Sequence, residues 1–185
     1  RCGSSSRSRR VRSTAAAAAG PVRMNEAPIA GVEDQPFAAD AIALIADQLR
    51  ATRPGREGSG AGDTVLLLGG NLVTARMQKL AAAIAARTGC RPMLAFYQAR
   101  LDIGRGLPAL ERLPYSVDAS VKLLSGARQM ILAGAVEPIG FFAYPGRPSR
   151  LVPPGCQLAT LTRPEEDTEA ALEALADALE IPAGE

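Results

Sequence analysis

Residues 64–71 carry the sequence Thr-Val-Leu-Leu-Leu-Gly-Gly-Asn, and this stretch decides the fold. Its four consecutive apolar residues, bounded by glycine, predict a strand that is buried on both faces. The two glycines allow the backbone to turn sharply and to approach a neighbour or a ligand closely. The apolar periodicity of residues 73–88 then predicts a helix. A strand, a Gly-Gly turn and a helix open many nucleotide-binding α/β domains, but the full G-x-G-x-x-G spacing is absent, so the functional signal is weak.

Composition limits the chemistry. The 185 residues are enough for one domain with its own core. The chain contains no His, which excludes His-based catalytic triads and most catalytic zinc sites. The cysteines Cys2, Cys90 and Cys156 are isolated from one another, and this pattern indicates free thiols of a cytoplasmic protein rather than a disulfide framework.

Charge is unevenly distributed. Residues 1–23 contain six arginines and no acidic residue, which leaves 15 basic against 19 acidic residues in the rest of the chain. The rest of the chain therefore offers no basic patch for nucleic acid. Residues 1–36 are rich in Arg, Ser and Ala, so we expect a disordered basic tail and lead-in. The tail is typical of a transit peptide or a basic arm, or of a linker or non-native segment. No stretch is long and apolar enough to span a membrane.

Residues 37–181 show the pattern of a single α/β domain. Periodicity predicts helices over residues 37–51, 73–88, 117–125 and 165–181, and strands over residues 64–68, 92–96, 129–133 and 156–161. In the second of these helices, Gln78 is expected on the outer face, and Gly89 is expected to cap the end. Residues 53–63 and 97–114, rich in Gly and Pro, are expected to be loops. This alternation predicts a parallel sheet with helices on both faces.

Ligands in such sheets bind at the carboxyl ends of the strands, near the switch point. The candidate rim therefore consists of Gly69, Gly70 and Asn71, of residues 96–98, and of residues 134–137 from Gly134 onward. Backbone N–H groups at the Gly-Gly turn and at the start of the next helix are expected to be able to cradle a phosphate. The alternative is that the two glycines only make the turn.

Candidate catalytic groups are few. Arg100, Asp102 and Arg105 in the long loop are able to grip an anion, although charged loop residues are usually only solvated. Glu111 and Glu137 are lone carboxylates, and Ser125 and Ser149 have no base nearby in sequence. The aromatic cluster Phe141, Phe142 and Tyr144 is expected to pack in the core or an interface rather than to form a stacking platform. These features indicate a domain that supports rather than reacts.

Six segments of residues 64–179 carry a family resemblance. They are Leu66-Leu67-Leu68-Gly69-Gly70, Arg105-Gly106-Leu107-Pro108, Leu123-Leu124-Ser125-Gly126, Ile131-Leu132-Ala133-Gly134-Ala135, Phe142-Ala143-Tyr144-Pro145-Gly146 and Pro153-Pro154-Gly155-Cys156-Gln157-Leu158. Their order and spacing resemble the central domain of thiamine-diphosphate-dependent enzymes, of the acetolactate-synthase-like and benzoylformate-decarboxylase-like kinds. The resemblance implies a Rossmann-like sheet of the DHS-like NAD/FAD-binding type, and it covers one of the three domains of such enzymes.

The resemblance also implies where the chemistry lies. In that family the catalytic glutamate lies in the preceding, pyrimidine-binding domain, and the motif for Mg²⁺ and the diphosphate of thiamine diphosphate lies in the following one. No catalytic residue is therefore implied here, and the complete enzyme is expected to be a homo-oligomer. Some members hold FAD or ADP in the central domain, which makes Gly69, Gly70, Asn71 and Gly134 the candidate cofactor-binding residues. Val136 stands where the flavin-binding members have an arginine, which argues against flavin.

Three interpretations remain open on the sequence. The chain is the central domain, or a fragment containing it, of a thiamine-diphosphate- and magnesium-dependent 2-oxo-acid enzyme, and it is inactive alone. Alternatively, it is a free-standing module that binds FAD or ADP. The third interpretation is an interaction protein without a ligand.

Overall fold

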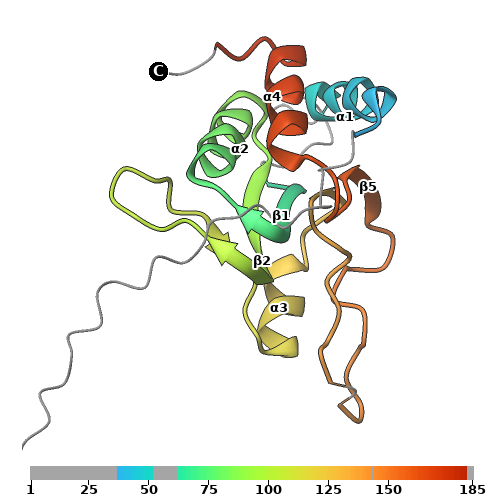
Figure 1. Ribbon diagram of the computed structural model, residues 1–185. Helices are drawn as coiled ribbons and strands as arrows, with labels where there is room; N and C mark the ends of the chain where they lie inside the picture. The colour runs from blue at the N-terminus through green and yellow to red at the C-terminus, as the bar shows by residue number, and fades with distance from the viewer. Residues whose placement is uncertain (1–36, 52–61, 143, 183–185) are drawn as a thin grey trace, which may run out of the picture. The chain divides into compact units, whose positions relative to one another are not determined.

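The computed structural model describes residues 37–51, 62–142 and 144–182, all of which belong to one unit, Glu33–Glu185 (Figure 1). The expected tail of residues 1–36 and most of the expected loop of residues 53–63 lie outside the described residues. In chain order the described elements are α1 (Ala39–Ala51), β1 (Thr64–Val73), α2 (Ala75–Thr88), β2 (Arg91–Leu101), β3 (Glu111–Arg112), α3 (Val117–Leu124), β4 (Gln129–Ala133), β5 (Gln157–Thr162) and α4 (Thr168–Ala178). No helix within this part of the chain is long and apolar enough to cross a membrane.

The strands form one sheet in the order β3-β2-β1-β4-β5, and every neighbouring pair is parallel. β1 lies at the centre, where Leu66 is paired with Pro92 of β2 on one side and with Ile131 of β4 on the other. The chain winds outward from β1 to β2 and β3, and then returns to place β4 on the other side of β1. The switch point therefore lies between β1 and β4, and the predicted α/β fold with a parallel sheet is confirmed.

The sheet separates two cores. Leu66 and Leu68 of β1 pack with α1, α2 and α4 on one face, whereas Val65 and Leu67 pack with α3 on the other. Figure 1 shows the three helices on one side of the sheet and α3 on the opposite side. These four side chains of β1 are fully buried, and burial of each stabilises the fold by about 2 kcal/mol. This double burial explains why β1 is a continuous apolar run rather than an alternating one.

The predicted Gly-Gly turn between strand and helix is wrong. β1 continues through both glycines to Val73, with an irregularity in its pairing to β2 between Leu68 and Gly70. The helix that follows begins only at Ala75. Gly70 has a φ of 91°, which a bulged strand needs as much as a turn does. Sequence patterns do not distinguish these two uses of glycine.

The long loop expected over residues 97–114 is also wrong in part. β2 runs on to Leu101 beside the extended end of β1, and the two-residue strand β3 lies within the remainder. The last helix begins at Thr168 behind the N-cap Asp167, three residues later than expected. The predicted ranges of residues 37–51 and 129–133 are matched by α1 and β4.

The helix predicted over residues 73–88 is α2, which begins two residues later, at Ala75, and its predicted end at Gly89 is confirmed in detail. Gly89 has a φ of 78° and donates its N–H to the carbonyl of Ala85. Gln78, expected on the outer face, is instead buried, because its Nε2 donates a hydrogen bond of 2.8 Å to the carbonyl oxygen of Asp102. This bond holds the chain after β2 against α2.

Candidate functional site

A cavity of about 420 Å³ lies at the carboxyl ends of β1, β2 and β4. Each of the three segments predicted to form a rim contributes to its lining: Gly70 and Asn71, residues 96–98, and residues 134–137. Gly69 is not part of the lining. The structure therefore brings the predicted rim together, because parallel strands present their carboxyl ends at the same edge of the sheet. The role of these residues in cofactor binding stays a prediction.

The glycines at this edge are required by close packing of β1 against the end of β4. A Cβ atom on Gly70 would lie 2.7 Å from the carbonyl oxygen of Gly134, and one on Gly69 would lie 2.9 Å from the Cβ of Ala135. A Cβ on Gly134 would lie 2.7 Å from the Oγ1 of Thr168. The expectation that these glycines permit a close approach to a neighbour is thus confirmed, and the neighbour is the protein itself.

Two buried threonines fix the position of Gly134. The N–H of Gly134 donates to the backbone oxygen of Thr162 at 3.1 Å and to its Oγ1 at 2.8 Å. The Oγ1 atoms of Thr162 and Thr168 are 2.9 Å apart and share a hydrogen bond. The N–H of Gly134 therefore already has its hydrogen-bond partners inside the protein and is not available to a ligand.

The cavity is largely apolar. Its lining includes the buried side chains of Leu67, Leu113 and Leu151 and several exposed aromatic rings. Glu137 is the only charged side chain in the described lining. The Oε1 of Glu137 accepts a hydrogen bond of 2.7 Å from the Nε of Arg150, and this contact raises the pKa of the Arg150 guanidinium. Gln98 is held by Arg112, whose Nη2 donates to its Oε1 at 2.9 Å.

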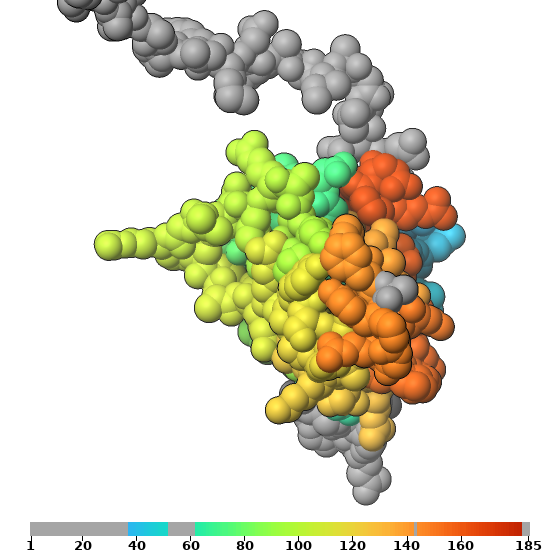
Figure 2. All heavy atoms as spheres, turned by 90° about the horizontal axis from the view of Figure 1, so that it is seen from below, coloured from blue at the N-terminus to red at the C-terminus, as the bar shows by residue number. Residues whose placement is uncertain are grey.

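Six of the seven aromatic residues of the chain form one continuous row, and four of the six line the cavity. Successive ring centroids lie 4.5–6.1 Å apart along the row, which consists of Tyr115, Phe96, Tyr97, Phe141, Phe142 and Tyr144. On the face seen in Figure 2, the yellow-green and yellow residues 95–116 lie beside the orange residues 136–150. Partial loss of hydration, followed by the hydrogen bond to Tyr144, raises the pKa of the Tyr115 phenol, so Tyr115 carries no negative charge near neutral pH.

The aromatic cluster was expected in the core or an interface; the core position is wrong, and the interface position stays a prediction. Phe141 is 62% exposed, Phe142 is 52% exposed and Tyr144 is 42% exposed. Sequence reasoning also missed Tyr97 and Tyr115 as members of the same row, because they are separated from the cluster by 26–44 residues along the chain. Of these two residues, only Tyr97 has a signal in the sequence, because it follows directly after the predicted second strand.

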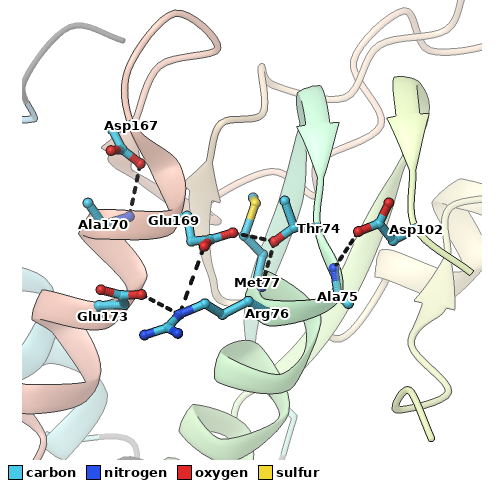
Figure 3. A network of polar contacts seen from close by, with 9 residues as sticks. All are labelled: Thr74, Ala75, Arg76, Met77, Asp102, Asp167, Glu169, Ala170 and Glu173. Atoms are coloured by element: carbon cyan, nitrogen blue, oxygen red, sulfur yellow. Dashed lines mark hydrogen bonds and ion pairs between the residues drawn. The ribbon is translucent and has the colours of Figure 1, made fainter. Parts of the chain in front are cut away.

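The start of α2 is occupied by the protein's own carboxylates (Figure 3). The N–H of Ala75 donates to the Oδ2 of Asp102 at 3.0 Å, and the N–H of Met77 donates to the N-cap oxygen of Thr74 at 3.0 Å. The hydroxyl of Thr74 donates in turn to Glu169 of α4, which also lies 3.8 Å from Arg76. The carboxylates thus take the position that the sequence suggested for a phosphate, at the positive end of the helix dipole.

Asp102 is therefore a helix cap and not one arm of an anion grip. Its other oxygen lies 4.0 Å from the Nε of Arg100, in an exposed pair of small energetic value. Arg105 is exposed, and so are Glu111 and Ser149. The hydroxyl of Ser125 donates to the carbonyl oxygen of Lys122 at 2.9 Å. None of these residues lines the cavity.

The described residues offer no group of three or more Cys, Asp or Glu side chains that could hold a metal ion. Cys90 and Cys156 are free thiols, as predicted. Burial raises the pKa of the Cys90 thiol, which makes it a poor nucleophile. The described part thus has a cavity without an evident catalytic group.

The chain resembles an acetolactate synthase large subunit. It is 38% identical over 149 residues to a protein of Mycobacterium tuberculosis (strain ATCC 25618 / H37Rv) named "Putative acetolactate synthase large subunit IlvX". The similarity covers 80% of this chain and 27% of that relative, so the chain spans about a quarter of the relative's length. No family model and no solved structure matches the chain.

The described residues do not fit the diphosphate of FAD or ADP. No Lys or Arg side chain is found in the described lining, and Val136, at the position where the resemblance expects an arginine, lines the cavity and is 68% exposed. The N–H of Gly134 is bonded to Thr162, and the start of α2 faces carboxylates. The devices that usually neutralise a phosphate are thus absent from the described lining.

Proposed function

We propose that this chain is the central domain, or a fragment containing it, of an acetolactate-synthase-like enzyme that acts on 2-oxo acids. The observation that carries the proposal is the 38% identity, which extends over most of this chain but only 27% of the relative. A parallel sheet with its switch point between β1 and β4 supports it, because that is the architecture the resemblance implies for a central domain.

In this proposal thiamine diphosphate and Mg²⁺ are bound by the pyrimidine- and diphosphate-binding domains of the parent enzyme. Thiamine diphosphate supplies the electron sink for 2-oxo-acid chemistry when it is bound. The residues of this chain supply the scaffold: the β1 core holds the sheet, and the glycine contacts between β1 and β4 set its carboxyl edge.

The proposal includes a cytoplasmic location and assembly of the complete enzyme into a homo-oligomer. The free thiols of Cys90 and Cys156 support the location, because reducing compartments keep thiols unpaired.

A turnover assay tests the proposal. The purified 185-residue chain is incubated with thiamine diphosphate, Mg²⁺ and short 2-oxo acids, and CO2 release and product formation are followed. We expect no turnover and no saturable heat of binding for thiamine diphosphate. Release of CO2 above the protein-free control would contradict the assignment of catalysis to other domains.

A further inference from the structure

The scaffold role leaves the cavity at the carboxyl edge without a use. Its volume of about 420 Å³ lies within the range of small-molecule sites, which extends over roughly 300–1,000 Å³. It lies at the switch point of the sheet, and apolar walls with a few polar groups are typical of such sites. Its lining therefore has the features of a binding site, and its chemistry restricts the ligand.

The first restriction is charge. The only charged side chain in the described lining is the carboxylate of Glu137. The nearest guanidinium groups are already engaged: Arg150 with Glu137 at 2.7 Å, and Arg112 with Gln98 at 2.9 Å and with the Phe96 ring at 5.6 Å from its centroid. Glu137 and Arg150 offset each other's charge, so a phosphate in the cavity would lose its hydration in an apolar lining, and either guanidinium group would have to leave its present partner to offset the phosphate charge. A neutral ligand with an N–H donor would instead find an acceptor in Glu137.

The second restriction is shape. Tyr97 is 56% exposed, Tyr115 is 51% exposed and Phe141 is 62% exposed, and all three line the cavity. Their rings contact one another directly or through Phe96, so the wall is continuous. Flat heteroaromatic rings of different chemical identity stack on such aromatic side chains, because every such ring has a π face.

We propose that this cavity binds an uncharged, planar heteroaromatic ring with N–H donors, of the purine-nucleoside type, and that it discriminates against the same ring carrying phosphates. The ring stacks on Tyr97, with the Phe141 ring inclined at 49° to Tyr97 beside it, and an N–H of the ligand ring donates to the carboxylate of Glu137. This inference does not depend on the proposed function, because it uses only the lining of the cavity.

Calorimetric titration of the full chain with adenosine, guanosine and ADP tests the proposal. We expect saturable binding of at least one nucleoside at one site per chain, and binding of ADP that is weaker than adenosine by about tenfold or more, equivalent to at least ~1.4 kcal/mol. Failure of both nucleosides to bind at millimolar concentration would overturn the proposal. Binding of ADP as tight as that of adenosine, or tighter, would overturn it as well.

Two pairs of variants locate the site and separate its two restrictions. Glu137→Gln removes the like charge and should reduce the difference in affinity between adenosine and ADP. Arg150→Gln frees the carboxylate from its partner and should increase this difference in affinity. Tyr97→Leu should weaken nucleoside binding by about tenfold. Leu44→Ala, at an apolar side chain of similar exposure on α1 and outside the lining, should leave it unchanged.

Circular dichroism confirms that each variant is folded before it is titrated. If the difference in affinity between adenosine and ADP changes in the same direction in Glu137→Gln and Arg150→Gln, the charge argument is contradicted. Equal losses of nucleoside affinity in Tyr97→Leu and Leu44→Ala would contradict the location of the site.

Discussion

Replacement of Gly70 by alanine tests whether position 70 requires glycine because the backbone of β1 closely approaches the backbone of Gly134 there. Gly70 has a φ of 91°, and the strain of a non-glycine residue at such an angle costs roughly 1–2 kcal/mol. In addition, the new Cβ would lie 2.7 Å from the carbonyl oxygen of Gly134, a backbone atom that cannot rotate away. Overpacking of this kind costs about 1–3 kcal/mol. The two effects together predict a loss of about 2–5 kcal/mol, a large part of the ~5–15 kcal/mol that stabilises a domain.

Gly106→Ala is the matched control. Gly106 has a φ of 81°, so it carries the same kind of backbone strain, but nothing lies within 4 Å of its added Cβ. Urea unfolding, followed by circular dichroism, gives the free energy of unfolding of both variants. We expect Gly70→Ala to lose about 1–3 kcal/mol more than Gly106→Ala. Equal losses would refute the close approach of β1 to Gly134 as the reason for the glycine.

Three further predictions concern other contacts of the same edge and core. Thr162→Val removes the hydroxyl shared by Gly134 and Thr168 and should cost about 1–3 kcal/mol in urea unfolding; an unchanged midpoint would mean that this buried network adds nothing. Asp102→Ala removes the carboxylate at the start of α2 and should cost about 1 kcal/mol, whereas Arg100→Ala, which removes only its exposed partner, should be near neutral; the reverse order would contradict the cap. Burial raises the pKa of Cys90 above its ordinary value of 9.0, so the unfolded chain releases this proton at a lower pH than the folded chain. The free energy of unfolding should therefore be constant below pH 9.0 and should fall as the pH rises through and beyond 9.0. Cys90→Ala should lessen this fall, and an equal slope in both proteins would contradict the role of Cys90.

The sequence was most informative where burial on both faces leaves a compositional mark. The apolar runs of residues 64–68 and 129–133 predicted β1 and β4, and the alternation of helices and strands predicted that the sheet is parallel. The convergence of Asn71, Gln98 and Glu137 on one cavity followed from topology alone, because each lies within a few residues of the carboxyl end of a parallel strand.

The sequence was least informative where one residue type serves two geometries or where contacts are distant. Glycine marks both turns and bulges, so the continuation of β1 through Gly70 was missed. β3 has two residues and no periodicity to detect. Gln78 was placed outside because it is polar, and its burial depends on one carbonyl contributed by Asp102, 24 residues away. The aromatic row depends on ring contacts between residues as far apart as Tyr97 and Phe141, which local patterns do not encode.

The parent enzyme can be tested most directly by reading the gene on both sides of the segment that encodes residues 1–185. If this chain is the central part of an acetolactate-synthase-like enzyme, the adjacent DNA should encode a pyrimidine-binding domain upstream and a diphosphate-binding domain downstream. Adjacent DNA without coding sequence for either domain would contradict the account.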